Sequence, residues 1–118
     1  MARRNRFDLE AEEQAWREVV AAADAVLAGK LGIIEGARVL SSLSHRVIDK
    51  WASDPEFRVF GALDTETDDL PVGRVRDLWD PAALVEKDAI IQRIEASSRA
   101  EVEEACRRLI VRFRATTR

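Results

Sequence analysis

Apolar residues recur every three or four positions along most of the chain, which is the spacing of a buried helical face. The first such stripe runs over residues 9–27, and Gly29 follows it as a left-handed helix terminator. A second stripe predicts a helix over residues 33–52 that ends near Trp51. Charged residues lie largely on the opposite sides, so each helix is expected to bury one face.

A short third helix is predicted by its start signals. Ser53 and Glu56 have the spacing of a capping box, and Pro55 suits a first helical turn. The apolar spacing then weakens, so the helix is expected to end near Thr65. It would bury Phe57, Phe60 and Leu63.

The last third of the chain predicts the longest helical stretch. Asp80 can cap a helix that has Pro81 in its first turn, and neither Gly nor Pro occurs again before the end of the chain. The stripe reaches about residue 114, as one helix or as two helices with a bend near Lys87. The residues expected in the core of the whole domain are Trp16, Leu40, Leu43, Phe57, Phe60, Ile94, Leu109 and Phe113.

These elements predict an all-α fold, because the two apolar runs that resemble strands are too short to build a sheet. The length of 118 residues fits one domain. We expect an antiparallel bundle of about four helices, with one long acidic crossover loop rich in Pro and Gly over residues 64–80. A basic arm over residues 1–6 and a frayed basic tail over residues 115–118 complete the expected organisation.

Composition narrows the class of protein. The chain is 47% hydrophobic and 35% charged, which is typical of a soluble globular protein. No apolar run approaches the roughly 18 residues of a membrane span, and no apolar stretch follows the basic N-terminus as in a secretory signal. The lone Cys106 has no partner for an intramolecular disulfide and is predicted to be a core hydrophobe, so a cytoplasmic location is expected.

Charge is segregated along the chain, although the net charge is only −3. Three arginines lie in residues 1–6 and five in residues 107–118, whereas residues 49–88 hold eleven acids against five bases. Basic ends suggest nucleic acid, but the acidic middle would repel phosphates. The favoured interpretation is that the terminal arginines complement a helix dipole, so nucleic-acid binding is not expected.

The acidic loop is the first candidate site. Its charged residues and its Trp surround a rigid Pro71 and a flexible Gly73, and Trp and Arg often dominate protein interfaces. As a docking surface for another protein it would use Asp64, Glu66, Asp68, Asp69, Arg74, Arg76 and Trp79. The alternative is structural: Asp68, Asp69 and Arg76 would pair with helix ends, and Trp79 would plug the core below the loop.

Metal binding by the same acids is disfavoured. Asp64, Glu66 and Asp68 alternate like the first ligands of a calcium loop, but the sixth position is Asp69 instead of Gly, and the twelfth is Val75 instead of Glu. No metal or cofactor is therefore expected.

Two enzyme hypotheses rest on short patterns. The pairs Glu10 with Glu13 and Glu66 with Asp69 have the spacings that all-α nucleotide pyrophosphohydrolases use to hold magnesium, but the second pair falls in the predicted loop. Arg38 and the only histidine, His45, are seven residues apart and share one helical side.

The Arg38–His45 spacing resembles the R-x(4–6)-H signature of HEPN-type ribonucleases, which are helical and dimerise to pair two sites. The resemblance implies a metal-independent ribonuclease in which Arg stabilises phosphate charge and His assists proton transfer. It covers eight residues, and Val39 stands where that family has a polar residue. This enzyme therefore stays the alternative to a binding protein, and no residue is assigned a catalytic role.

Three longer stretches carry a wider resemblance: "LAGKLGIIEGARVLSSL", "FGALDTETDDLPVGRVRDLWDPAAL" and "EEACRRLIVRF". Together they resemble an uncharacterised family of small all-helical bacterial proteins, some of them associated with immunity genes of polymorphic toxin systems. The most specific part is E-T-D-x-L-P-x-G-x-x-R-x-x-W, and the likeness spans residues 9–113. The resemblance implies a non-enzymatic protein-binding module, such as an immunity-type inhibitor of a basic toxin domain. A structural or regulatory helical homodimer is a further alternative.

Overall fold

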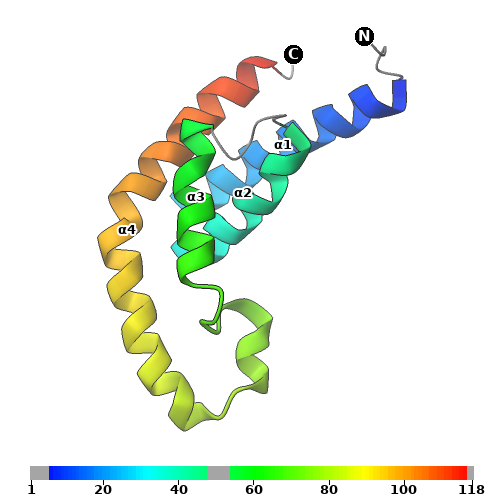
Figure 1. The fold of residues 1–118 in the computed structure, drawn as a ribbon. Coiled ribbons are helices and arrows are strands. Elements are labelled where there is room, and N and C mark those ends of the chain that lie inside the picture. Colours follow the sequence, from blue (N-terminus) through cyan, green and yellow to red (C-terminus); the bar gives the residue numbers. More distant parts are fainter. Residues whose placement is uncertain (1–5, 48–53, 117–118) are drawn as a thin grey trace.

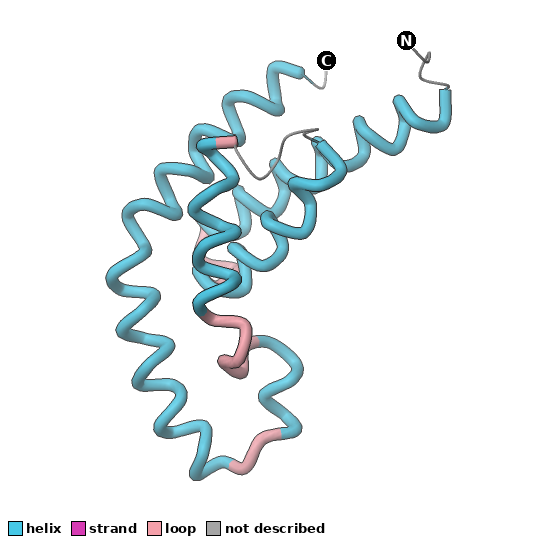
Figure 2. Tube along the Cα trace, viewed as in Figure 1, coloured by secondary structure: helices cyan, strands magenta, loops and turns pink. Residues whose placement is uncertain are grey.

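The computed structural model describes residues 6–47 and 54–116, and within these ranges the chain is helical without any strand (Figures 1 and 2). The predicted all-α class is therefore confirmed for this part of the chain. The elements, in chain order, are α1 (Arg6–Leu27), α2 (Ile33–Val47), α3 (Pro55–Glu66), the 3-10 helix η2 (Gly73–Leu78) and α4 (Pro81–Thr116).

Helices α1 and α2 are joined by a tight turn that needs glycine. Gly29 has a φ of 76°, in the left-handed region that side chains disfavour, so the predicted terminator is confirmed. The two helices then pack closely, because a Cβ on Gly36 would collide with the Val26 side chain. The described part of α2 ends at Val47, and Trp51 lies outside the described residues.

Helix α3 begins one residue later than the capping-box pattern predicted. Its N-cap is Asp54, whose Oδ1 accepts a hydrogen bond of 3.1 Å from the backbone N–H of Glu56. Pro55 occupies the first turn, as predicted. Ser53 lies outside the described residues. Asp54 also accepts a hydrogen bond from Arg112 of α4. This contact joins residues that are far apart in the sequence, so the local pattern does not contain it.

Helix α4 settles the question of one helix or two, because it is continuous over its 36 residues. At 1.5 Å per residue this corresponds to about 54 Å, so α4 runs past the end of the other helices. Asp80 accepts a hydrogen bond from the Ala82 backbone N–H at 3.3 Å, which confirms the predicted cap. The helix is bowed, with its convex side turned away from α1, α2 and α3 (Figure 1).

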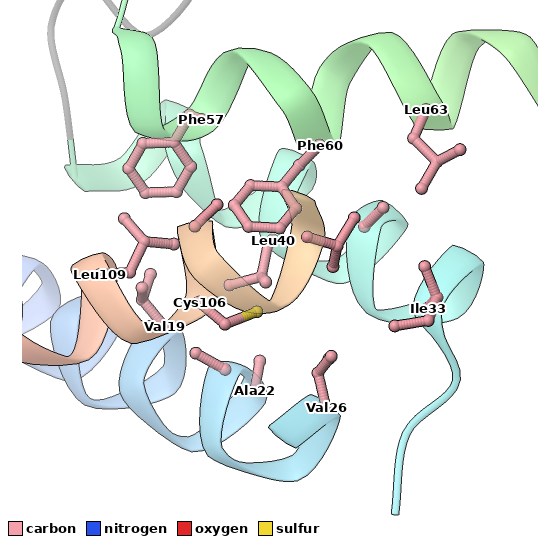
Figure 3. Close-up of a cluster of buried hydrophobic side chains, with 14 of the residues drawn as sticks. Val19, Ala22, Val26, Ile33, Leu40, Phe57, Phe60, Leu63, Cys106 and Leu109 are labelled. Atoms are coloured by element: carbon pink, nitrogen blue, oxygen red, sulfur yellow. The ribbon is translucent and has the colours of Figure 1, made fainter. Parts of the chain in front are cut away.

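The main core fills the space between the four α-helices, where α1 packs on α2 and α4, and α3 packs on α2 and α4. Phe57 and Phe60 of α3 point toward Leu40 of α2 and toward Cys106 and Leu109 of α4 (Figure 3). The aromatic rings of Phe57, Phe60 and Phe113 meet edge to face. Of the eight predicted core residues, the buried ones are Leu40, Phe57, Phe60, Leu109 and Phe113.

The remaining predicted core residues lie at its margin. Trp16, Leu43 and Ile94 are partly buried and pack against the cluster, whereas Leu9 at the start of the first stripe is 46% exposed. Cys106 is fully buried, and this burial raises the pKa of its thiol to about 11. The cysteine is therefore a core hydrophobe, as predicted. None of the helices in the described ranges has the length and apolar character needed to span a membrane.

Candidate functional site

The segment predicted as one acidic loop, residues 64–80, is mostly ordered into short elements. Asp64 and Glu66 belong to the last turn of α3, and residues 73–78 form η2. A single turn between the two helices is closed by a hydrogen bond of 3.0 Å from the Leu70 backbone N–H to the Thr67 carbonyl oxygen. The sequence predicted one continuous loop between the third and the last helix, whereas the segment between α3 and α4 contains the 3-10 helix η2.

Arg38 of α2 holds the end of α3 in place. Its Nη2 donates hydrogen bonds to the backbone carbonyl oxygens of Thr67 and, at 3.1 Å, of Leu70. Its Nε lies 3.8 Å from an Asp64 carboxylate oxygen. These carbonyl groups belong to Thr67, the C-cap residue of α3, and to Leu70 in the turn that follows, so the guanidinium holds this turn against α2. Sequence reasoning missed this role because it joins residues about 30 positions apart.

Apolar side chains also hold the turn after α3 in place. Leu70 is buried in a second, smaller cluster with Ile34 of α2 and Ile91 of α4, and Pro71 beside it is fully buried. Gly73 follows with a φ of 71°, and a Cβ there would collide with the Glu35 carboxylate of α2. The glycine predicted to be flexible is therefore the residue that the fixed backbone requires.

Arg76 ties η2 to α4. Its two terminal nitrogens form a forked ion pair with the Asp88 carboxylate, at 2.6 and 3.0 Å, and Nη1 also donates to the Pro71 carbonyl oxygen at 3.2 Å. The hydrogen bond from Arg76 lowers the pKa of Asp88 below its usual range. Arg76 therefore braces the crossover through Asp88, an acid within α4 that the sequence reasoning had not singled out, whereas the structural alternative expected Arg76 to pair with a helix end.

The braced crossover nevertheless exposes large apolar side chains. Leu78 at the end of η2 is 86% exposed, Val85 in α4 is 72% exposed and Val75 is 43% exposed. We call residues 64–88 the acidic end, because they hold eight acids against three bases. Single exposed apolar side chains are common on protein surfaces, so the distinguishing feature of Leu78 is that it lies, with Val75, on a segment that Arg38 and Arg76 hold in place. Sequence reasoning did not single out Leu78.

The other predicted site residues divide into two groups. Glu66, Asp68, Asp69 and Arg74 are exposed. Asp64 is partly buried beside Arg38, and Trp79 is half-buried, so neither extreme expected for the Trp applies. The predicted set therefore contains exposed groups that can meet a partner and, in Asp64 and Arg76, groups that contact the protein itself.

The arginines near the C-terminus are engaged with acids. Arg112 binds both Asp54 carboxylate oxygens, at 3.1 and 2.9 Å, and Glu56 at 3.3 Å. Arg107 and Arg108 both reach Glu104 on the same helix. Arg114 contacts Asp24 of α1 at 2.9 Å. Arg112 and Arg114 therefore join α4 to the start of α3 and to α1, which helix-dipole reasoning alone did not predict.

The two residues of the ribonuclease pattern, Arg38 and His45, make different contacts. Arg38 is held by the carbonyl oxygens after α3, whereas His45 is exposed and lines a groove of about 660 Å³ between α2 and α3. Arg38 does not line that groove; its lining includes Ser41, Phe57, Gly61 and Thr65. A catalytic use of Arg38 would therefore have to break the contacts that hold the crossover.

The side chains that the metal hypotheses would use do not form a cluster of ligands in the part of the chain that is described. No group of three or more His, Cys, Asp or Glu side chains is close enough there to hold a metal ion. Glu10 and Glu13 lie in α1, and Glu66 and Asp69 lie around the end of α3.

Comparisons of the chain with protein-family models, curated proteins and solved structures find no match. The resemblance to the immunity-associated family therefore stays a prediction.

Proposed function

We propose that this chain is a non-enzymatic protein-binding module that recognises a basic protein through its acidic end. The observation that carries the proposal is Leu78, which is 86% exposed on a crossover that Arg38, Leu70 and Arg76 hold in place. A fixed backbone with an exposed apolar anchor binds with little loss of conformational freedom.

Charge defines the kind of partner. The acidic end has a net charge of −5, and Glu66, Asp68 and Asp69 are exposed on it. Surface carboxylates attract a positively charged protein over several ångströms and speed its association. Toxic nuclease domains have such surfaces because their substrate is a polyanion, so an immunity-type inhibitor of a basic toxin domain is the specific function that we propose.

The scaffold suits this role. We infer that α1 to α4 form an antiparallel bundle whose long helix α4 carries the acidic end beyond the main core. The protein would act in a bacterial cytoplasm, where a lone thiol such as that of Cys106 stays reduced.

Growth rescue tests the proposal. The proposal expects a gene for a basic toxin domain beside the gene for this chain, and the chain would be co-expressed with that domain, as wild type and as Leu78→Asp. We expect the wild type to restore growth and Leu78→Asp to fail, with an unchanged melting temperature. Leu9→Asp is the matched control, because Leu9 is an exposed leucine on α1, and it should restore growth. Full rescue by Leu78→Asp would refute the proposed surface.

A further inference from the structure

The outer face of α4, which overlaps the acidic end at Val85 and Glu86, has an internal symmetry. The side of α4 opposite the core carries exposed residues at spacings of three and four, which place them on one helical face. In chain order they are Val85, Ala89, Gln92, Ala96, Ala100, Glu104, Arg107 and Val111. Val85 and Val111, at the two ends, are 72% and 73% exposed.

The stripe is symmetric about position 98. Residues 85 and 111 lie equally far from that position on either side, and so do residues 96 and 100. If two α4 helices are laid side by side in opposite directions, with a twofold axis at position 98, each valine lies on the same level as a valine of the other copy. Likewise, each alanine near the centre meets an alanine. A twofold interface requires such self-complementarity.

Shape agrees with this arrangement. Because α4 is bowed with its convex side outward, two copies would touch first at the middle of the helix (Figure 1). The smallest exposed side chains of the stripe, Ala96 and Ala100, lie there and allow close approach. The longer side chains of Arg107 and Val111 lie toward the end, where the bowed helices diverge and the gap is wider.

Charge also agrees. Across the axis, Arg93 would lie beside Glu104 of the second copy, and Glu86 would lie beside Arg107 and Arg108 of the second copy. A parallel arrangement would instead place each of these residues beside its own equivalent, so that like charges meet. Opposite charges across an interface favour one orientation over the other.

We propose that a second copy of this chain packs antiparallel on the outer face of α4, around a twofold axis that passes between Ala96 and Ala100. The crossover and η2 lie on the inner side of α4 (Figure 1), so the dimer leaves Leu78 open for a partner of another kind.

Sedimentation equilibrium of the intact chain from about 1 to 100 µM tests the association. We expect twice the mass of 13.3 kDa. The double variant Ala96→Glu with Ala100→Glu places carboxylates opposite one another and should raise the dimer Kd at least about tenfold. Ala21→Glu, at an exposed alanine of α1, is the control and should change the Kd by less than about twofold. A monomer over the whole range, or equal effects of both variants, would overturn the proposal.

Disulfide trapping tests the orientation independently of any folding defect in those variants. Ala89→Cys and Arg107→Cys proteins would be oxidised separately and as a mixture, because these exposed positions face each other across the axis and lie nearer the middle of the helix. The antiparallel dimer predicts a cross-link only in the mixture, whereas cross-links within each separate protein would contradict it. Wild type is the control, because the buried Cys106 thiol, with its pKa raised to about 11, should form no intermolecular disulfide.

Discussion

Two leucines in the crossover, Leu70 and Leu78, provide a matched test of how the acidic end is built. Leu70 is 6% exposed in the cluster with Ile34 and Ile91, whereas Leu78, eight positions later, is 86% exposed. Truncating each to Ala removes the same atoms. The fold described above predicts very different costs.

For Leu70→Ala, the lost transfer free energy and the cavity together cost about 2–5 kcal/mol. We expect the lower part of this range, because the second cluster is small and lies at the edge of the main core. At roughly 4 °C per kcal/mol for a domain of this size, the melting temperature should fall by about 8–12 °C. For Leu78→Ala, an exposed position, the change should stay within about 0.5 kcal/mol.

Thermal unfolding followed by circular dichroism, with urea unfolding of the same variants, measures both values. Equal destabilisation by the two substitutions would show that Leu78 packs against the protein in solution. No destabilisation by Leu70→Ala would show that the crossover is not anchored by the second cluster. Either result would refute the picture of a braced segment that presents an apolar anchor.

Three further predictions concern the rest of the fold. Gly36→Ala should cost about 1–3 kcal/mol in urea unfolding, because its Cβ collides with Val26, and the double variant with Val26→Ala should recover part of the loss. Burial alone would raise the pKa of Asp54, but its hydrogen bonds and charge attraction with Arg112 lower it below 3.8 overall. The stability from this pair should therefore be present above pH 3.8 and be lost as the pH falls through the lower folded-state pKa, and Arg112→Ala should flatten that acid-limb dependence in pH-dependent unfolding. Native Cys106 should resist alkylation at pH 8 and react only after unfolding, as mass spectrometry would show.

Local signals predicted the helix boundaries well where one residue type decides the conformation. Gly29 ends the first helix, and Pro55 and Pro81 open the third and the last, because their backbone preferences act within a few residues. The capping residue of α3 was misplaced by one position because Ser and Asp are both good caps. The Asp54 contact with Arg112, 58 residues away, is absent from a local pattern.

The crossover was the least predictable part because its order comes from distant contacts. The polar run and the Leu-Pro step favoured a loop, yet the turn after α3 is held by hydrogen bonds from Arg38 of α2 to the carbonyl groups of Thr67 and Leu70. Likewise, Arg76 of η2 pairs with Asp88 of the next helix, α4. The pattern did place the candidate surface in the right segment, but it could not tell that Arg76 braces the segment while Leu78 is exposed.

The central claim is that the acidic end binds a basic protein without carrying the stability of the fold. The most direct measurement is the association rate with a basic toxin domain of the kind that the proposal expects, over a salt series, for wild type and for Asp68→Lys with Asp69→Lys, beside the melting curves of both. Both aspartates are exposed, so melting should change little, because surface charges contribute about 0–1 kcal/mol each. Association should slow by roughly tenfold at low salt, and the difference should shrink as salt rises. An unchanged rate at every salt concentration, or a collapse of melting, would contradict the account.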